Sequence, residues 1–133
     1  MSRNLLDTSA YSAFKRGHPG IQRALQEAEE ICVPAIAIGE LHAGFRGGTK
    51  EKENRHELRK FLASPCVRLL TVDEETAEKY KLIQHDLRIA GTPIPTNDIW
   101  ISAIAMKEGL RVVTTDPHYK KIPHVVVDLH GAT

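Results

Sequence analysis

The stretch Leu5-Leu6-Asp7-Thr8-Ser9-Ala10, near the N-terminus, decides the fold of this chain. Two apolar residues end at an acid, and small and hydroxyl-bearing residues that can begin a helix follow directly. The pattern returns in Val112-Val113-Thr114-Thr115-Asp116, where a β-branched run again ends at an acid. We therefore expect two short strands, one that Leu5-Leu6 opens and Asp7 ends and one at 111–114, each with a carboxylate where it ends.

Short apolar runs alternate with helical patterns along the rest of the chain. Further strands are expected at 31–33, 67–70 and 125–127. Helices are expected from Thr8, over 21–28, from Pro34 to the Gly47-Gly48 stop, over 50–63, from a Thr71–Glu74 capping box to Gly91, and over 98–108. Strands that alternate with helices imply βαβ units and an α/β fold with a parallel sheet covered on both faces.

Length and composition limit the class of protein. The chain has 133 residues, of which 41% are hydrophobic and 26% charged, and this predicts one domain over residues 1–133. The formal net charge of +1 indicates no globally basic or acidic partner surface. Cys32 and Cys66 form no C-x-x-C motif, so a reducing, cytoplasmic location is the expectation. We expect no membrane span or signal peptide, since no apolar run is long enough.

Four acids lie at strand ends or helix starts rather than in solvated charged runs: Asp7, Glu40, Asp98 and Asp116. Parallel α/β sheets place their binding and catalytic sites at the edge formed by the C-terminal ends of the strands. Each acid also has an ordinary structural explanation. Asp7 could cap a helix, and Asp98 could favour a helix start. Asp116 before Pro117 is typical of a turn, and Glu40 could be a surface ion-pair partner.

If the four carboxylates lie close together in the fold, their mutual repulsion must be offset. Two unit charges ~4 Å apart cost ~4 kcal/mol at an effective dielectric constant of ~20. Hard divalent ions such as Mg²⁺ or Mn²⁺ take carboxylate oxygens as ligands, and they suit hydrolysis of phosphodiesters by activated water. Zinc is less favoured, because the histidines show no metal-ligand spacing and are expected to be scattered on the surface.

Other side chains could support such a site. The hydroxyls of Thr8, Ser9 and Thr114 could bind a carboxylate or a phosphate, although capping explains Ser9 as well. Arg46, which follows Glu40 along the same helix, is the candidate phosphate contact. The other cations of segment 50–60 alternate with glutamates, which is more typical of a solvated face.

These segments together resemble the PIN-domain family, and within it the VapC-like ribonuclease toxins of toxin–antitoxin pairs. Leu5-Leu6-Asp7-Thr8-Ser9-Ala10 is similar to the family's opening strand and first acid. Ile38-Gly39-Glu40-Leu41, Pro95-Thr96-Asn97-Asp98-Ile99-Trp100 and Val113-Thr114-Thr115-Asp116 are similar to the segments that carry the other three acids. No single motif is specific, but the four occur in the family's order over essentially the whole chain.

The resemblance implies a three-layer α/β/α sandwich with a central, mostly parallel sheet. It implies a Mg²⁺- or Mn²⁺-dependent endoribonuclease with Asp7, Glu40, Asp98 and Asp116 as catalytic and metal-binding residues. It also implies an RNA substrate, inhibition by a cognate VapB-like antitoxin, and a homodimer. Two alternatives stay open from the residues alone: a DNA nuclease or phosphatase of the same chemistry, and a non-catalytic binding module.

Overall fold

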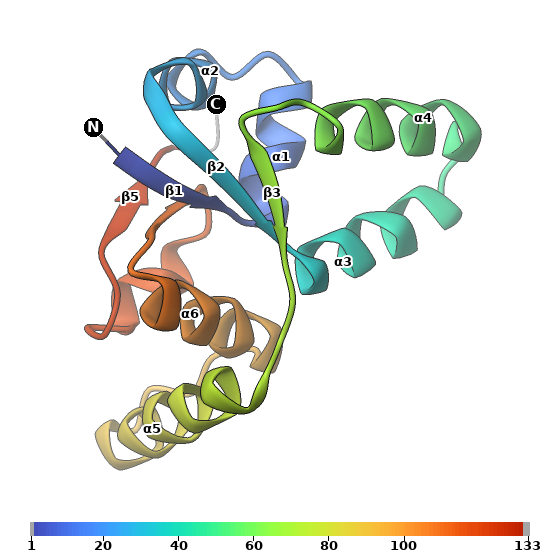
Figure 1. Ribbon diagram of the computed structural model, residues 1–133. Helices are drawn as coiled ribbons and strands as arrows, with labels where there is room; N and C mark the ends of the chain where they lie inside the picture. The colour runs from blue at the N-terminus through green and yellow to red at the C-terminus, as the bar shows by residue number, and fades with distance from the viewer. Residues whose placement is uncertain (1, 132–133) are drawn as a thin grey trace.

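The computed structural model describes residues 2–131, and within them five strands form one parallel sheet (Figure 1). The spatial order of the strands is β3-β2-β1-β4-β5. Their bounds are β1 (Ser2–Leu6), β2 (Ala28–Pro34), β3 (Val67–Leu70), β4 (Arg111–Thr114) and β5 (Val127–Leu129). Every strand pair is parallel, so the C-terminal ends of all five strands share one edge.

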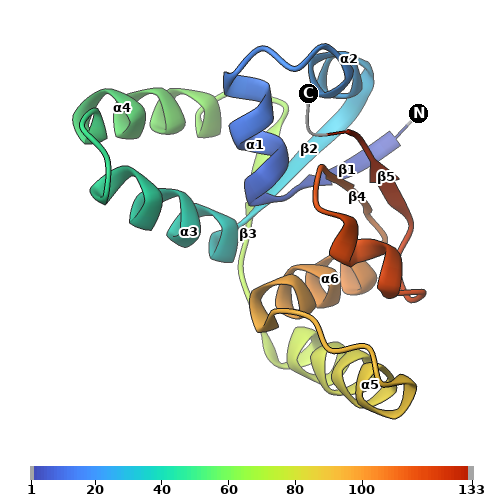
Figure 2. The same cartoon turned by 180° about the vertical axis from the view of Figure 1, so that it is seen from behind.

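Helices cover both faces of this sheet. Their bounds are α1 (Thr8–Lys15), α2 (Pro19–Glu27), α3 (Ala35–Arg46), α4 (Glu51–Leu62), α5 (Glu74–Ala90) and α6 (Thr96–Glu108), with a 3₁₀ helix η1 (Pro117–Lys121) after β4. The two views show α5 and α6 on one side of the sheet and α1, α2 and α4 on the other (Figures 1 and 2). The predicted α/β/α sandwich is therefore confirmed.

Side-chain alternation along the central strands explains the two apolar cores. Leu5 contributes to the core beneath α6, and Leu6 contributes to the core beneath α1, because successive side chains of a strand point to opposite faces. Val112 and Val113 of the neighbouring β4 divide between the two cores in the same way. All four side chains are fully buried, which accounts for the uninterrupted apolar runs in the sequence.

Helix α6 lies between the sheet and α5, as its apolar sequence predicts. Ile99, Ile101 and Ile104 are almost fully buried, and α5 packs along the outer side of α6. Tyr80 of α5 stacks on Trp100 of α6 with ring centroids 4.0 Å apart. Trp100 is thus an intramolecular packing residue.

Several predicted boundaries were wrong. The fifth strand begins at Val127 rather than at Val125, and Val126 is exposed. Helix α6 begins at Thr96, so Asp98 lies in its first turn rather than at its start. Helix α2 begins at Pro19 rather than at residue 21, because the side chain of His18 caps it. The 3₁₀ helix η1 was not predicted.

The capping box predicted at Thr71 is also wrong. Asp73 is the N-cap of α5, and its carboxylate accepts a hydrogen bond from the backbone N–H of Thr76. An aspartate before a helical turn is as good a cap as a threonine, so local sequence could not discriminate between the two registers. Within residues 2–131, no helix has the length and apolar character that a membrane crossing would require.

Candidate metal centre

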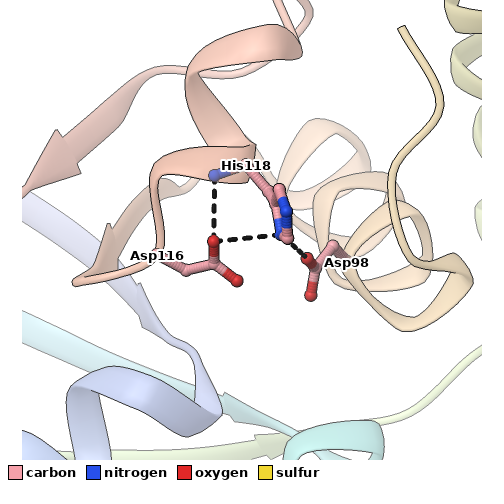
Figure 3. Close-up of side chains that lie close together, drawn as sticks. All are labelled: Asp98, Asp116 and His118. Atoms are coloured by element: carbon pink, nitrogen blue, oxygen red, sulfur yellow. Dashed lines mark hydrogen bonds and ion pairs between the residues drawn. The ribbon is translucent and has the colours of Figure 1, made fainter.

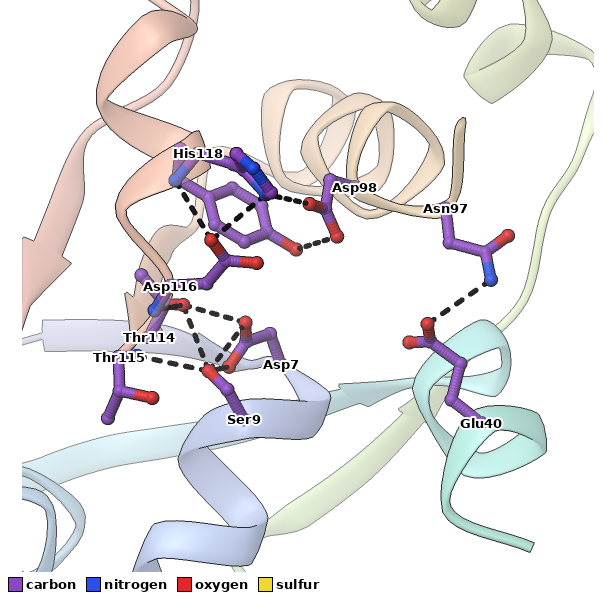
Figure 4. A network of polar contacts seen from close by, with 10 residues as sticks. Asp7, Ser9, Glu40, Asn97, Asp98, Thr114, Thr115, Asp116 and His118 are labelled. Atoms are coloured by element: carbon purple, nitrogen blue, oxygen red, sulfur yellow. Dashed lines mark hydrogen bonds and ion pairs between the residues drawn. The ribbon is translucent and has the colours of Figure 1, made fainter. Parts of the chain in front are cut away.

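The predicted acids lie at the C-terminal edge of the sheet, where β1 and β4 deliver the chain to the next element (Figure 4). Asp7 follows β1, and Asp116 follows β4. Asp98 comes from the first turn of α6, which lies over the same edge. Parallel pairing of β1 with β4 is what brings the first and last of these acids together, although 109 positions separate them.

Asp7 is the most firmly held of the acids. It caps α1 by accepting the backbone N–H of Ala10 at 2.8 Å, and it accepts hydroxyl hydrogen bonds from Thr114 at 2.7 Å and from Ser9 at 2.9 Å. Only 4% of the residue is exposed, and this burial raises the pKa of Asp7 to about 6. The hydrogen bonds from these three donors favour the ionised carboxylate of Asp7, but their effect on its pKa is smaller than that of burial.

Ser9 and Thr114 also tie the two strand ends to each other. The Ser9 hydroxyl accepts the backbone N–H of Thr115 at 3.0 Å, and the Thr114 hydroxyl accepts the backbone N–H of Asp116 at 2.9 Å. Each hydroxyl therefore uses its proton on the Asp7 carboxylate and its lone pair on the backbone after β4. This network fixes Asp7 relative to Asp116.

Asp98 is nearly buried and faces the other two aspartates. Burial, followed by the negative charge of Asp116, raises the pKa of Asp98 to about 6. Its Oδ1 accepts the phenol of Tyr119 at 3.4 Å, and the Tyr119 ring itself is fully buried. Desolvation raises the pKa of Tyr119 as well, so this phenol stays protonated and acts only as a donor.

His118 completes the group between Asp98 and Asp116 (Figure 3). Its Nδ1 lies 3.1 Å from Asp116 Oδ1 and 3.4 Å from Asp98 Oδ2. The backbone N–H of His118 donates to Asp116 Oδ1 at 2.9 Å and begins η1. Each of the three offers one ligand atom within 4.8 Å of the other two, which is close enough for them to bind the same metal ion.

Glu40 lies across from the three aspartates, on α3 (Figure 4). Its Oε1 accepts the Thr8 hydroxyl, and its Oε2 accepts the side-chain amide of Asn97 at 3.2 Å. These contacts connect α3 to the starts of both α1 and α6. Glu40 is therefore half-buried at the border of the site, on the far side from His118.

The residues present fit a divalent cation. Two carboxyl groups with a pKa near 6 reflect buried charge that the surrounding side chains leave uncompensated. Within the described part of the chain, Asp98 Oδ2 and His118 Nδ1 are buried atoms without a hydrogen-bond partner. Buried polar atoms normally have partners, and a cation would supply one to both.

Arg46 is not part of this group. Its side chain is 83% exposed at the end of α3 and forms an ion pair of 4.0 Å with Glu51. Arg46 lies six positions after Glu40, which corresponds to about 9 Å along the helix axis. A phosphate that Arg46 contacts would therefore lie at the border of the site.

Three side chains at the site were not predicted from the sequence. His118 was assigned to the scattered surface histidines, whereas Asn97 and Tyr119 were not singled out. An Asp-x-His spacing directly after a buried strand could have indicated His118, since a turn there folds the histidine back over the aspartate. Asn97 is adjacent to Asp98 but contacts a different acid, which only the position of α3 reveals.

Comparison with known proteins agrees with this architecture. Residues 5–125 match the PIN domain family. Ribonuclease VapC4 of Mycobacterium tuberculosis is 30% identical over 95 residues, which are 71% of this chain and 73% of that protein.

Solved structures show the same fold. VapBC from Salmonella typhimurium, crystallised bound to DNA, has a TM-score of 0.84 at 24% identity over 96% of this chain and 98% of that chain. FitAcB from Neisseria gonorrhoeae has a TM-score of 0.75 at 27% identity over 92% and 94% of the two chains. With the family match covering most of its length, the chain belongs to the PIN domain family.

Proposed function

We propose that this chain is a metal-dependent endoribonuclease that hydrolyses RNA phosphodiester bonds, and that it is the toxin of a toxin–antitoxin pair. The observation that carries the proposal is the meeting of Asp7, Asp98 and Asp116 from three separate elements at one sheet edge. Membership of the PIN domain family and the similarity to ribonuclease VapC4 support RNA as the substrate.

The proposed cofactor is Mg²⁺ or Mn²⁺. Asp7, Asp98 and Asp116 would hold it, with Glu40 on the opposite side of the site. When bound, such an ion lowers the pKa of a coordinated water and neutralises negative charge on the scissile phosphate. Carboxylate oxygens are the donors that these hard ions prefer.

The chain's own residues orient the acids. Ser9 and Thr114 donate to Asp7 and hold its carboxylate toward Asp116. Thr8 and Asn97 donate to the two oxygens of Glu40, so the orientation of this side chain does not depend on the substrate. Arg46 is proposed to contact the phosphate backbone of RNA at the border of the site.

The test is cleavage of end-labelled RNA by the purified protein with Mg²⁺. We expect Asp98→Asn to reduce the rate at least about 100-fold, because a lost metal ligand removes several kcal/mol of charge stabilisation. The matched control is Asp86→Asn, an exposed aspartate of α5, which should cleave at the wild-type rate. Full activity of a folded Asp98→Asn protein would refute the assignment.

A substrate panel separates the alternatives. RNA, single-stranded DNA and small phosphate esters are incubated with the wild-type protein, with Mg²⁺ or with EDTA. Cleavage of RNA alone, abolished by EDTA, supports the proposal. Preference for DNA or for small esters would indicate the other nuclease or phosphatase activities, and binding without any turnover would indicate a non-catalytic module.

A VapB-like antitoxin is the proposed partner. The fold is similar to that of a chain in the solved structure of DNA-bound VapBC from Salmonella typhimurium. An apolar hollow between α1, α2 and α4 is lined in part by Phe14, Leu25 and Phe61, and it suits an amphipathic segment. Co-expression with the candidate antitoxin should give a stable complex, and Phe14→Glu should weaken it while the isolated variant still cleaves RNA.

A homodimer is proposed as the active assembly. Leu82 and Ile89 are 45% and 73% exposed, and their spacing of seven residues places them on one face of α5. Light scattering should give twice the monomer mass, and Leu82→Glu should halve it. We further propose that residues 1–133 act as one domain in the cytoplasm, which limited proteolysis and cell fractionation can test.

A further inference from the structure

The nitrogen atom in the acidic cluster distinguishes this site from one built of oxygen donors alone. His118 Nδ1 lies 3.1 Å from Asp116 Oδ1 and 3.4 Å from Asp98 Oδ2, and all three ligand atoms lie within 4.8 Å of one another. Figure 3 shows the imidazole between the two carboxylates. The Nδ1 atom therefore faces the acids, although the side chain as a whole is 43% exposed.

These separations of 3.1 Å and 3.4 Å fit neighbouring ligands of one ion. Adjacent ligand atoms of a hard divalent ion, each bound at about 2.1 Å, lie roughly 3 Å apart. Within residues 2–131, neither His118 Nδ1 nor Asp98 Oδ2 forms a hydrogen bond, although both atoms are buried. Asp98 is only 9% exposed, so water offers its oxygen little compensation.

The backbone holds the imidazole at this place. The N–H of His118 donates to Asp116, which caps η1, and the next residue, Tyr119, is fully buried with its phenol on Asp98. The backbone that carries the imidazole is thus fixed by contacts to the two aspartates, which places the base of the side chain next to them.

We propose that His118 Nδ1 is a direct ligand of the cation, together with Asp98 and Asp116, and that it makes the site selective for Mn²⁺ over Mg²⁺. Imidazole nitrogen suits transition-metal ions, whereas Mg²⁺ retains oxygen ligands and water. The inference rests on the metal site of the proposed function, but not on the cleavage reaction.

The experiment measures metal binding to the untagged, chelator-treated protein without RNA. Mn²⁺ and Mg²⁺ are titrated by calorimetry into wild type, His118→Ala and His56→Ala, a control that removes an exposed histidine of α4. Electron spin echo spectroscopy of the Mn²⁺ complexes then detects a directly bound imidazole through its nitrogen coupling. Circular dichroism verifies that each variant is folded.

We expect nitrogen coupling in wild type and in His56→Ala, and its absence in His118→Ala. The Mn²⁺ dissociation constant should rise at least about tenfold in His118→Ala, and the Mg²⁺ constant much less. Absence of nitrogen coupling in the wild type, or an equal loss of both ions, would overturn the proposal. If nitrogen-coupled Mn²⁺ binds but RNA stays intact, the proposed nuclease function fails while this inference stands.

Discussion

Two aspartates in this molecule have the same local role and opposite electrostatics. Asp7 caps α1 and Asp73 caps α5, and each accepts a backbone N–H and a hydroxyl from the turn that follows. Asp73 is exposed and forms an ion pair with Lys107, which lowers its pKa. Asp7 is buried beside other acids, and desolvation raises its pKa to about 6.

The difference shows what helix capping can and cannot explain. A cap needs one acceptor, which a serine or an asparagine supplies without a charge to desolvate. For Asp73, capping and the neighbouring lysine account for the aspartate completely. Asp7 keeps a buried charge that its helix does not require, and this cost is what indicates a bound cation.

The largest expected effect is on RNA cleavage, and it should follow removal of the charge of Asp7 but not removal of the charge of Asp73. Asp7→Asn keeps an acceptor for the backbone of Ala10 but removes one carboxylate from the cluster. We expect RNA cleavage to fall at least about 100-fold in this variant, for lack of a metal ligand. Asp73→Asn should cleave at the wild-type rate, and equal rates for the two variants would contradict the distinction.

The pH dependence of stability should also separate the two residues. Because the folded-state pKa of Asp7 lies above the ordinary 3.8, the folded protein binds this proton more tightly than the unfolded chain. The stabilisation is complete below pH 4 and is lost as the pH rises through about 6. For Asp7 it amounts to at most about 3 kcal/mol.

Urea unfolding of the metal-free protein at pH 5 and pH 7.5 measures this effect. We expect wild type to be less stable at pH 7.5, and Asp7→Asn to lose part of that dependence. Asp73→Asn should retain the wild-type slope, since the pKa of Asp73 is lowered and its contribution disappears only in more acidic solution. An unchanged slope in Asp7→Asn would show that the buried carboxyl does not titrate in this range.

Metal binding should reverse the destabilisation at neutral pH. An ion at 100 times its dissociation constant stabilises the folded state by about 2.7 kcal/mol, which is on the order of 10 °C in melting temperature for this size. Calorimetry should show this shift for wild type and for Asp73→Asn with Mn²⁺. A similar shift in Asp7→Asn would place the ion elsewhere.

The smallest expected effect is a loss of stability on removal of Asp73, which caps α5 but has no part in the metal site. Asp73→Ala removes the acceptor for Thr76 and the partner of Lys107 at the exposed start of α5. We expect the melting temperature to fall by about 5 °C, because a single cap contributes modestly. Cleavage at saturating RNA should not change, and a large loss of activity would show that α5 is coupled to the site.

Much of the fold was predictable from local patterns. The strands at Val67–Leu70 and Arg111–Thr114 begin and end where the apolar runs predict. Boundaries failed where two signals compete within a few residues, as at Thr71 and Asp73, because each could cap the same turn. The 3₁₀ helix after Asp116 was missed, since five residues carry too little periodicity.

The sequence by itself determined the alternation of strands and helices and the placement of four acids at their junctions, because periodicity and capping depend on neighbours along the chain. Only the tertiary structure decided which of the acids are buried close enough together to repel one another. Pairing of β1 with β4 buries Asp7 and places it near Asp116, while η1 turns His118 between Asp116 and Asp98. Desolvation and ligand geometry arise from contacts between distant segments, and these do not exist until the chain has folded.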